Sequence, residues 1–225
     1  MLRLRPVLEA DVPALYAISL ATGAAGGDAT DQYVDGRLVG HIYSAPYAVL
    51  CPETAFVAED EQGVGGYVVG AVDTVTFEER LERDWWPRLR EIYQDPSGIP
   101  WKDWTPDQLR SFMIHHPHRM TGAMIEAFPA HVHMNLLPQM QRRGIGRRLI
   151  ELWLATAGNL GGVGVHCGVN AANQAGLAFW QAVGFAPYED AHRTSRSTKW
   201  FVRTIEGPAD AAMGEGSNLS GMAPD

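Results

Sequence analysis

The chain has 225 residues, of which 46% are hydrophobic and 20% are charged. This length suits one domain, because a single hydrophobic core can grow to about 250 residues before chains divide. The composition excludes a chain dominated by disorder, and the formal net charge of −8 disfavours nucleic-acid binding through a basic surface. With only two cysteines and no apolar run typical of a signal peptide or a spanning helix, we expect a cytoplasmic protein with a small-molecule partner and no membrane partner.

The amino-terminal part alternates between strand and helix patterns. In chain order it predicts a strand at 2–6, a helix at 9–20, a loop at 22–31, a helical stretch near residue 40, and a hairpin of strands at 54–59 and 66–73. The loop contains three glycines, and loops of this composition often lie over a site.

A helical insertion is expected at 74–130, before the central strand. It contains predicted helices at 77–92 and 105–115 and could cover an acceptor site. His115, His116 and His118 could be metal ligands, but they lack a matched partner set at supporting spacing, so we favour a solvated loop and no metal site.

The carboxyl-terminal part carries the most regular patterns. They predict a strand at 131–137, a helix at 144–157, a strand at 163–169, a helix at 174–183 and a last strand at 198–205. One domain is therefore expected at 1–206, followed by a disordered tail at 207–225 that is rich in Gly, Ala, Ser and Pro.

The segment 136–149 is a strand end, a glycine-containing turn and a helix start in succession. Free N–H groups and the helix dipole favour an anion there, and glycine lets a phosphate approach the main chain. Arg142, Arg143, Arg147 and Arg148 add positive charge at the same place. The alternative is an ordinary capped helix with a solvated arginine face.

Gln141, Gly144 and Gly146 match the Gln/Arg-x-x-Gly-x-Gly/Ala motif, and the run 173–185, which ends in Gly184-Phe185, is similar to a second motif. The chain thus resembles the GNAT (GCN5-related) N-acetyltransferases. The phrases 130–138 and 85–87 resemble more narrowly the GNAT-like domain fused to animal O-GlcNAc hydrolases and its free-standing bacterial relatives.

This resemblance implies an α/β fold of the α+β type, in which a mixed, mostly antiparallel sheet flanked by helices splits into a V-shaped cleft for acetyl-CoA. It also implies a β-bulge near Leu136 and main-chain contacts from Leu136 and Leu137 to pantetheine. The implied acyl-CoA-binding residues are Leu136, Leu137, Gln141, Arg142, Arg143, Gly144, Ile145, Gly146, Arg147, Arg148, Asn170, Asn173, Phe179 and Trp180.

The implied reaction is direct attack by an acceptor amine on acetyl-CoA. GNAT enzymes commonly have a tyrosine that protonates the leaving thiolate, but this chain has Trp180, whose indole is no acid at neutral pH. A base or water relay could come from His131, His133, Asn135 and Asp73, of which Asn135 cannot itself be a base; for His131 and His133 we favour a structural, hydrogen-bonding role over a catalytic one.

Three functional hypotheses remain. The first is an acetyltransferase acting on the amine of a small molecule or of a protein lysine, as a monomer or homodimer. The second is a non-catalytic acetyl-CoA-binding sensor, motivated by Trp180. The third, a nucleic-acid-binding protein built on the arginine cluster, conflicts with the net charge of −8.

Overall fold

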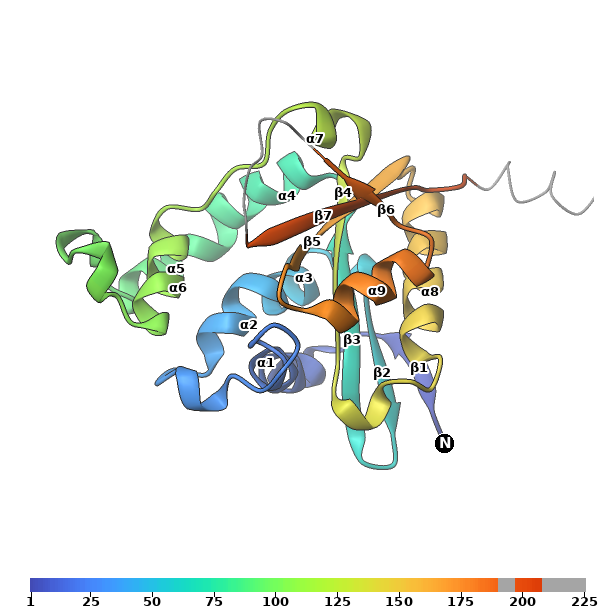
Figure 1. The fold of residues 1–225 in the computed structure, drawn as a ribbon, viewed down its shortest axis with the longest axis horizontal. Helices are drawn as coiled ribbons and strands as arrows, with labels where there is room; N and C mark the ends of the chain where they lie inside the picture. Colours follow the sequence, from blue (N-terminus) through green and yellow to red (C-terminus); the bar gives the residue numbers. More distant parts are fainter. Residues whose placement is uncertain (190–196, 208–225) are drawn as a thin grey trace, which may run out of the picture.

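A computed structural model describes residues 1–189 and 197–207 of the chain. In these residues a seven-stranded sheet runs through the molecule (Figure 1). The disordered tail expected at 207–225 lies outside the described residues except for Gly207. No helix in the described part is long and apolar enough to cross a membrane.

The sheet has the order β1-β2-β3-β4-β5-β7-β6, and every neighbouring pair is antiparallel except β4 and β5. This confirms the mixed, mostly antiparallel sheet that the sequence predicted. The strands are β1 (Arg3–Pro6), β2 (Ala55–Asp60), β3 (Gly63–Ala71), β4 (Ala130–Leu136), β5 (Gly164–Asn170), β6 (Ala186–Tyr188) and β7 (Thr198–Thr204).

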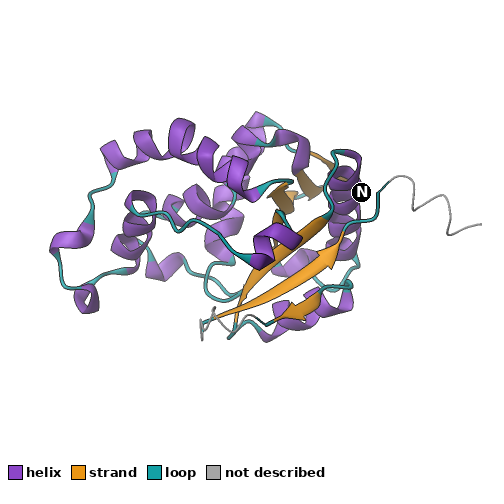
Figure 2. Ribbon diagram, turned by 90° about the horizontal axis from the view of Figure 1, so that it is seen from above, coloured by secondary structure: helices purple, strands orange, loops and turns teal. Residues whose placement is uncertain are grey.

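Helices cover both faces of the sheet (Figures 1 and 2). They are α1 (Val12–Ala21), α2 (Arg37–Tyr43), α3 (Ala45–Leu50), α4 (Thr74–Arg80), α5 (Trp86–Ile92), α6 (Pro106–His115), α7 (Ala123–Ala127), α8 (Ile145–Asn159) and α9 (Gln174–Ala182). Because side chains alternate along a strand, β4 supplies Val132 to a core under α8 and α9, while Tyr67 and Val69 of β3 join a second core under α1–α6.

Strands β4 and β5 pair at only two positions, where Ala130 and His131 face Val165 and His166. Beyond these residues the two strands diverge, which produces the V-shaped opening that we expected. The β-bulge near Leu136 is a correction: β4 pairs with β3 without a register shift from His131 to Leu136. The opening therefore arises from the short parallel ladder rather than from an interruption of the β3–β4 ladder.

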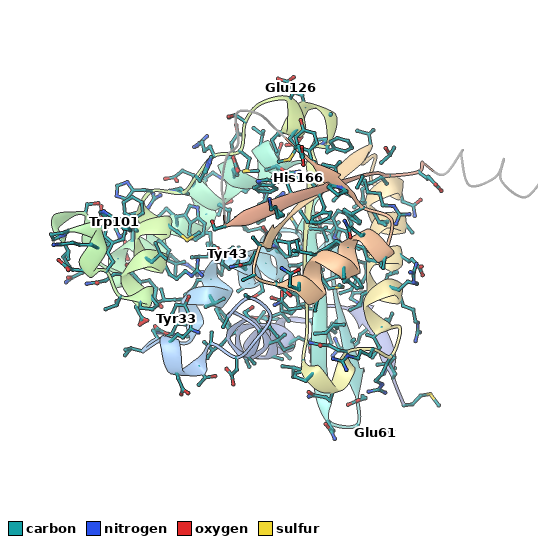
Figure 3. The ribbon with its side chains drawn as sticks, viewed as in Figure 1. Tyr33, Tyr43, Glu61, Trp101, Glu126 and His166 are labelled. Carbon is teal, nitrogen blue, oxygen red and sulfur yellow. The ribbon has the colours of Figure 1, made fainter. Side chains whose placement is uncertain are left out.

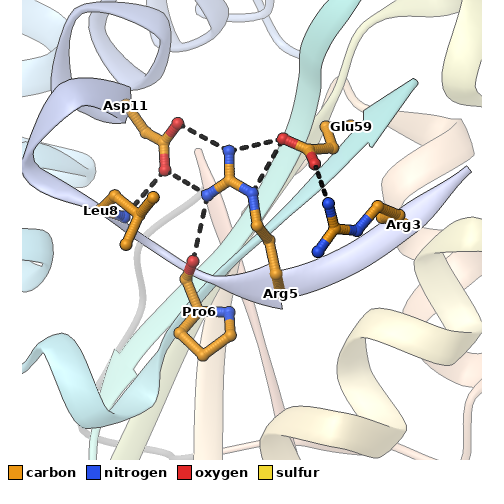
Figure 4. Close-up of polar contacts among 6 residues, drawn as sticks. All are labelled: Arg3, Arg5, Pro6, Leu8, Asp11 and Glu59. Atoms are coloured by element: carbon orange, nitrogen blue, oxygen red, sulfur yellow. Dashed lines mark hydrogen bonds and ion pairs between the residues drawn. The ribbon is translucent and has the colours of Figure 1, made fainter. Parts of the chain in front are cut away.

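Arg5 ties the amino-terminal strand to the rest of the fold (Figure 4). Its guanidinium donates to Asp11 at 2.5 and 2.9 Å and to Glu59 of β2 at 2.6 and 2.8 Å. Hydrogen bonding from Arg5 lowers the pKa of Asp11. This partly buried network fixes the start of α1 against β1 and β2.

The insertion differs in detail from the prediction. The single helix expected at 77–92 is divided into α4, a π-helical stretch at Leu81–Trp85, and α5. Pro87 in the first turn of α5 has no N–H to donate, which interrupts the regular i→i−4 pattern. The sequence did not predict α3, α7 and β6, because they span six, five and three residues and are too short to show a period.

Candidate functional site

A pocket of about 130 Å³ lies between the diverging parts of β4 and β5. It is lined by Thr22, Gly26, Val132, His133, Met134, Asn135, Cys167, Gly168, Val169, Asn170, Asn173 and Trp180. The loop at 22–31 therefore does lie over a site, as its composition predicted. No signal in the sequence identified Thr22 and Gly26 as the loop residues that reach the pocket.

The start of α8 lies where β4 ends and the chain turns. Gly144 precedes the helix with a φ of +73°, which favours glycine, and a Cβ there would meet no atom within 4 Å. Ile145 and Gly146 make no main-chain N–H hydrogen bond to the described residues, as is usual in a first helical turn. Open space, free N–H groups and the dipole of a 15-residue helix together suit a phosphate.

Gly146 has a different role from Gly144. A Cβ at this position would lie 3.0 Å from Cε2 of Phe179 and 3.3 Å from Cδ1 of Leu136. A side chain at Gly146 would therefore crowd Phe179 of α9 and Leu136 of β4.

The four arginines of this segment are not equivalent. Arg143 donates to the carbonyl of Gln139 at 3.1 Å, and Arg147 donates to the carbonyl of Ala182 at 2.7 Å. Arg142 and Arg148 are exposed and have no side-chain hydrogen bond or ion pair within the described part of the chain. These two guanidiniums are the ones available to an anion at the helix start.

Some of the main-chain hydrogen-bonding groups at the end of β4 already have partners within the protein. The N–H of Leu137 donates to the carbonyl of Gly65 at 2.8 Å, so of the main-chain groups of Leu137 only the carbonyl is left for the expected contact with pantetheine. Gln141 donates through Nε2 to the carbonyl of Leu136 at 2.9 Å. Since main-chain groups alternate between edges along a strand, Met134 and Leu136 direct their N–H groups toward the opening beside β5.

The start of α9 forms the opposite wall. Asn173 caps α9 by accepting from the N–H of Gly176 at 2.8 Å, and Asn170 accepts from the N–H of Ala172 at 2.9 Å. Trp180 is buried, its ring centroid lies 4.7 Å from that of Phe185, and it also reaches the pocket. The structure thus brings Asn170, Asn173 and Trp180 together in the cleft.

His131 is a structural histidine. Thr74 donates its hydroxyl to the carbonyl of Pro129 at 2.6 Å, which leaves its oxygen to accept from Nδ1 of His131 at 2.8 Å. Nε2 of the same ring then accepts from the Tyr47 hydroxyl at 2.9 Å. Burial lowers the pKa of His131 well below its ordinary value, so the neutral ring is the form that fits.

His133 lines the pocket instead. Its ring lies 5.8 Å from Tyr43 and 5.5 Å from Tyr47, and it makes no hydrogen bond to any described residue. Burial, followed by the charge of His166, lowers its pKa to about 4. A neutral imidazole at pH 7 can accept a proton, although the low pKa makes it a weak base. The sequence gave no indication that Tyr43 would lie beside it.

The other two candidates for proton transfer, Asn135 and Asp73, lie in different parts of the structure. Asn135 lines the pocket and donates through Nδ2 to the hydroxyl of Thr22. Asp73 lies at the far end of β3, where it caps α4 by accepting from the N–H of Thr76 at 2.7 Å. Asp73 does not line the pocket, so the structure does not place it with His133.

The histidine-rich run makes no shared site. His115 bonds to the carbonyl of Tyr93, His116 to Asp95, and His118 to the carbonyl of Arg119. Among residues 1–189 and 197–207 no group of three or more His, Cys, Asp or Glu side chains could hold a metal ion.

Comparison with known proteins decides the family. The fold aligns with the crystal structure of SsHAT, a GNAT acetyltransferase, at a TM-score of 0.83 and 32% sequence identity over 91% of this chain and 98% of that one. The chain belongs to the GNAT superfamily. No family model matches the chain.

Two further GNAT-fold structures are more distant. They are a GNAT superfamily phosphinothricin acetyltransferase from Sinorhizobium meliloti in complex with acetyl-CoA (TM-score 0.52, 16% identity) and YncA from Salmonella typhimurium with its cofactor acetyl-CoA (TM-score 0.52, 14% identity). They cover 92% and 91% of this chain, and 91% and 94% of their own chains.

Among curated proteins, the rat and mouse Protein O-GlcNAcase are 24% identical to the chain over 152 residues. This match covers 67% of this GNAT chain and 16% of each O-GlcNAcase. It agrees with the narrower resemblance of the phrases 130–138 and 85–87.

Proposed function

We propose that this GNAT protein is an acetyl-CoA-dependent N-acetyltransferase. Two observations together carry the proposal: the opening between β4 and β5, and the free N–H groups at the start of α8, the helix that follows β4 in the chain. A pantetheine arm, which carries amide groups, fits a cleft with unpaired strand edges, and a pyrophosphate fits a helix start. Two structures of the same fold contain acetyl-CoA.

The residues proposed to hold the pyrophosphate surround the first turn of α8. The N–H groups of Gly144, Ile145 and Gly146 would donate to it, and Arg142 and Arg148 would supply charge. Gln141, Arg143 and Arg147 act less directly, because each already contacts a main-chain carbonyl of the protein and so positions the turn.

The residues proposed for the acyl arm line the cleft. The N–H groups of Met134 and Leu136 face the arm, and one of them would stabilise negative charge on the thioester oxygen. Asn170, Asn173 and Trp180 form the α9 side of the pocket, and Phe179 of the same helix lies against Gly146 at the start of α8.

Acetyl-CoA supplies an activated acyl group. An amine nitrogen attacks the carbonyl carbon, the C–S bond breaks, and the thiolate leaves. His133 is placed to take the amine proton, directly or through a water, because it lines the pocket and makes no hydrogen bond to a described residue. Cys167 also lines the pocket, but burial raises the pKa of its thiol well above the ordinary value, so it stays protonated and takes no proton. Asn135, held by Thr22, would orient the acceptor rather than take its proton.

The second candidate function is acetyl-CoA binding without turnover, and Trp180 favours it. By the motif resemblance Trp180 replaces the tyrosine that would protonate the thiolate, and its ring packs against Phe185 and Phe179. An indole N–H cannot supply that proton at neutral pH.

The experiment that separates the two functions is a screen of amines with acetyl-CoA, read by mass spectrometry of the acetylated product, for the wild type and His133→Gln. We expect turnover by the wild type and a loss of about 10²–10⁴-fold in kcat/KM for the variant, with unchanged acetyl-CoA binding. Tight acetyl-CoA binding without any product across the screen would favour the sensor.

A further inference from the structure

Arg110 of α6 is a half-buried cation that pairs with phenols rather than with a carboxylate. Its Nε donates to the hydroxyl of Tyr33 at 3.0 Å, and its Nη1 donates to the hydroxyl of Tyr43 at 3.0 Å. It forms no ion pair within residues 1–189 and 197–207. Shielding a charge from water is costly unless something compensates for it.

The three side chains together offer donors only. Each phenol oxygen accepts from the guanidinium, so its own O–H remains available to donate. Neither hydroxyl makes another hydrogen bond to the described residues, and Nη2 of Arg110 makes none. A cation surrounded by unused donors matches an anion, and the planar guanidinium matches a carboxylate in particular.

The rings of Tyr33 and Tyr43 also shield the charge. The guanidinium carbon lies 5.3 Å from the ring centroid of Tyr43 and 6.0 Å from that of Tyr33. Electrostatic attraction to an anion is stronger in such a partly desolvated position than in open water.

This group adjoins the cleft through Tyr43. The ring centroid of Tyr43 lies 5.8 Å from that of His133, which lines the pocket. The guanidinium carbon is therefore no more than about 11 Å from the His133 ring. Tyr33 and Tyr43 lie on the side of the molecule where α2 meets α6 (Figure 3).

We infer that Arg110, Tyr33 and Tyr43 bind a carboxylate on the acceptor, so that the preferred substrate is a small amine that also carries a carboxylate. The carboxylate would lie at Arg110 while the amine reaches toward His133. This inference rests on the proposed acetyltransferase function, because it assigns the acceptor of that site. A purely structural role, in which Arg110 only joins α6 to α2, predicts no preference among acceptors.

The test uses three amino acids of increasing length, 3-aminopropanoate, 4-aminobutanoate and 6-aminohexanoate, and the carboxamide of each. Equilibrium binding to the protein is measured with and without saturating CoA, and acetylation rates are measured in parallel. We expect at least one carboxylate to bind about tenfold or more tightly than its carboxamide, because a charge-assisted pair contributes roughly 1.5–3 kcal/mol.

Arg110→Gln should remove this preference, so that carboxylate and carboxamide bind within about twofold of each other, while CoA binding stays unchanged. Arg110→Lys should retain part of the preference, since a point charge lacks the planar fork. Arg83→Gln is the matched control: Arg83 lies in the same insertion, pairs with Asp84 at the surface, and should not affect the preference. Tyr43→Phe removes one donor but keeps the ring beside His133, so it tests the site if Arg110→Gln does not fold.

The inference is overturned if no carboxylate binds, if the carboxamides bind equally well, or if Arg110→Gln weakens both members of a pair equally. Failure of the proposed function looks different. In that case acetyl-CoA itself does not bind, while the carboxylate preference can still be measured on the protein without CoA.

Discussion

Replacement of the buried His131 by Leu should change both the stability of the protein and its dependence on pH. The ring accepts from Tyr47 at 2.9 Å and donates to Thr74 at 2.8 Å, and both partners are buried. His131→Leu leaves the Tyr47 hydroxyl without its partner, which costs about 1–3 kcal/mol in free energy of unfolding. At pH 7 the variant should be less stable by about that amount.

Acidification acts in the opposite direction, because it destabilises the wild type and not the variant. The folded pKa of His131 is depressed by burial, so the unfolded chain binds more protons and the wild type loses stability as pH falls below the unfolded value of about 6.5. At pH 5.5 this loss is about 1.4 kcal/mol, and it is absent from the variant. The stability deficit of His131→Leu should therefore shrink by about 1 kcal/mol between pH 7 and pH 5.5.

Urea unfolding at both pH values measures these differences. Tyr47→Phe is the control, because it removes the phenol and keeps the imidazole; it should destabilise by about 1 kcal/mol at both pH values. A deficit of His131→Leu that stays constant or grows on acidification would refute the assignment of His131 as a buried neutral histidine.

Three further predictions concern the site and its frame. Gly146→Ala places a methyl 3.0 Å from the Phe179 ring and should lower the free energy of unfolding by about 1–3 kcal/mol; unchanged urea unfolding would contradict the close packing. Arg148→Gln and Arg142→Gln should each weaken acetyl-CoA binding and reduce its salt dependence, as measured by titration at two salt concentrations; equal slopes in variants and wild type would exclude a phosphate contact. Asp73→Ala should destabilise the protein by about 1 kcal/mol through loss of the α4 cap and leave acetylation rates unchanged; a large loss of acetylation rate would instead indicate a catalytic role for Asp73.

The sequence predicted those parts of the fold that depend on local pattern. The strand at 131–137, the helices at 144–157 and 174–183 and the hairpin at 54–73 are long or strongly patterned, so periodicity and turn residues located them within a few residues. Gly144 was predicted from its place in a motif, and its positive φ supplies the physical reason.

Features that depend on tertiary contacts were not predictable. The opening beside β4 results from a ladder of only two residue pairs with β5, and no residue of β4 encodes that length by itself. The Leu137 N–H is used by Gly65, about 70 residues earlier in the chain. Asp73 was grouped with His133 because both belong to neighbouring strands, but it lies at the opposite end of the β3–β4 ladder.

The arginine cluster shows the same limit. Arg142, Arg143, Arg147 and Arg148 are indistinguishable in the sequence, yet two of them contact carbonyls of the protein and two do not. Nothing in the sequence indicated that Arg110 could bind a ligand, because its partners Tyr33 and Tyr43 come from a distant segment of the chain.

The most direct test of the acetyl-CoA site is calorimetric titration of acetyl-CoA into the wild type, Gly144→Asn and Gly144→Asp. Both substitutions enter the same left-handed conformation and the same open space, so they differ mainly by one negative charge. Binding that is retained in Gly144→Asn and weakened about tenfold or more in Gly144→Asp is the predicted result, because a carboxylate at the helix start repels a pyrophosphate. Absence of binding by the wild type, or equal binding by the two variants, would contradict a phosphate cradle at α8.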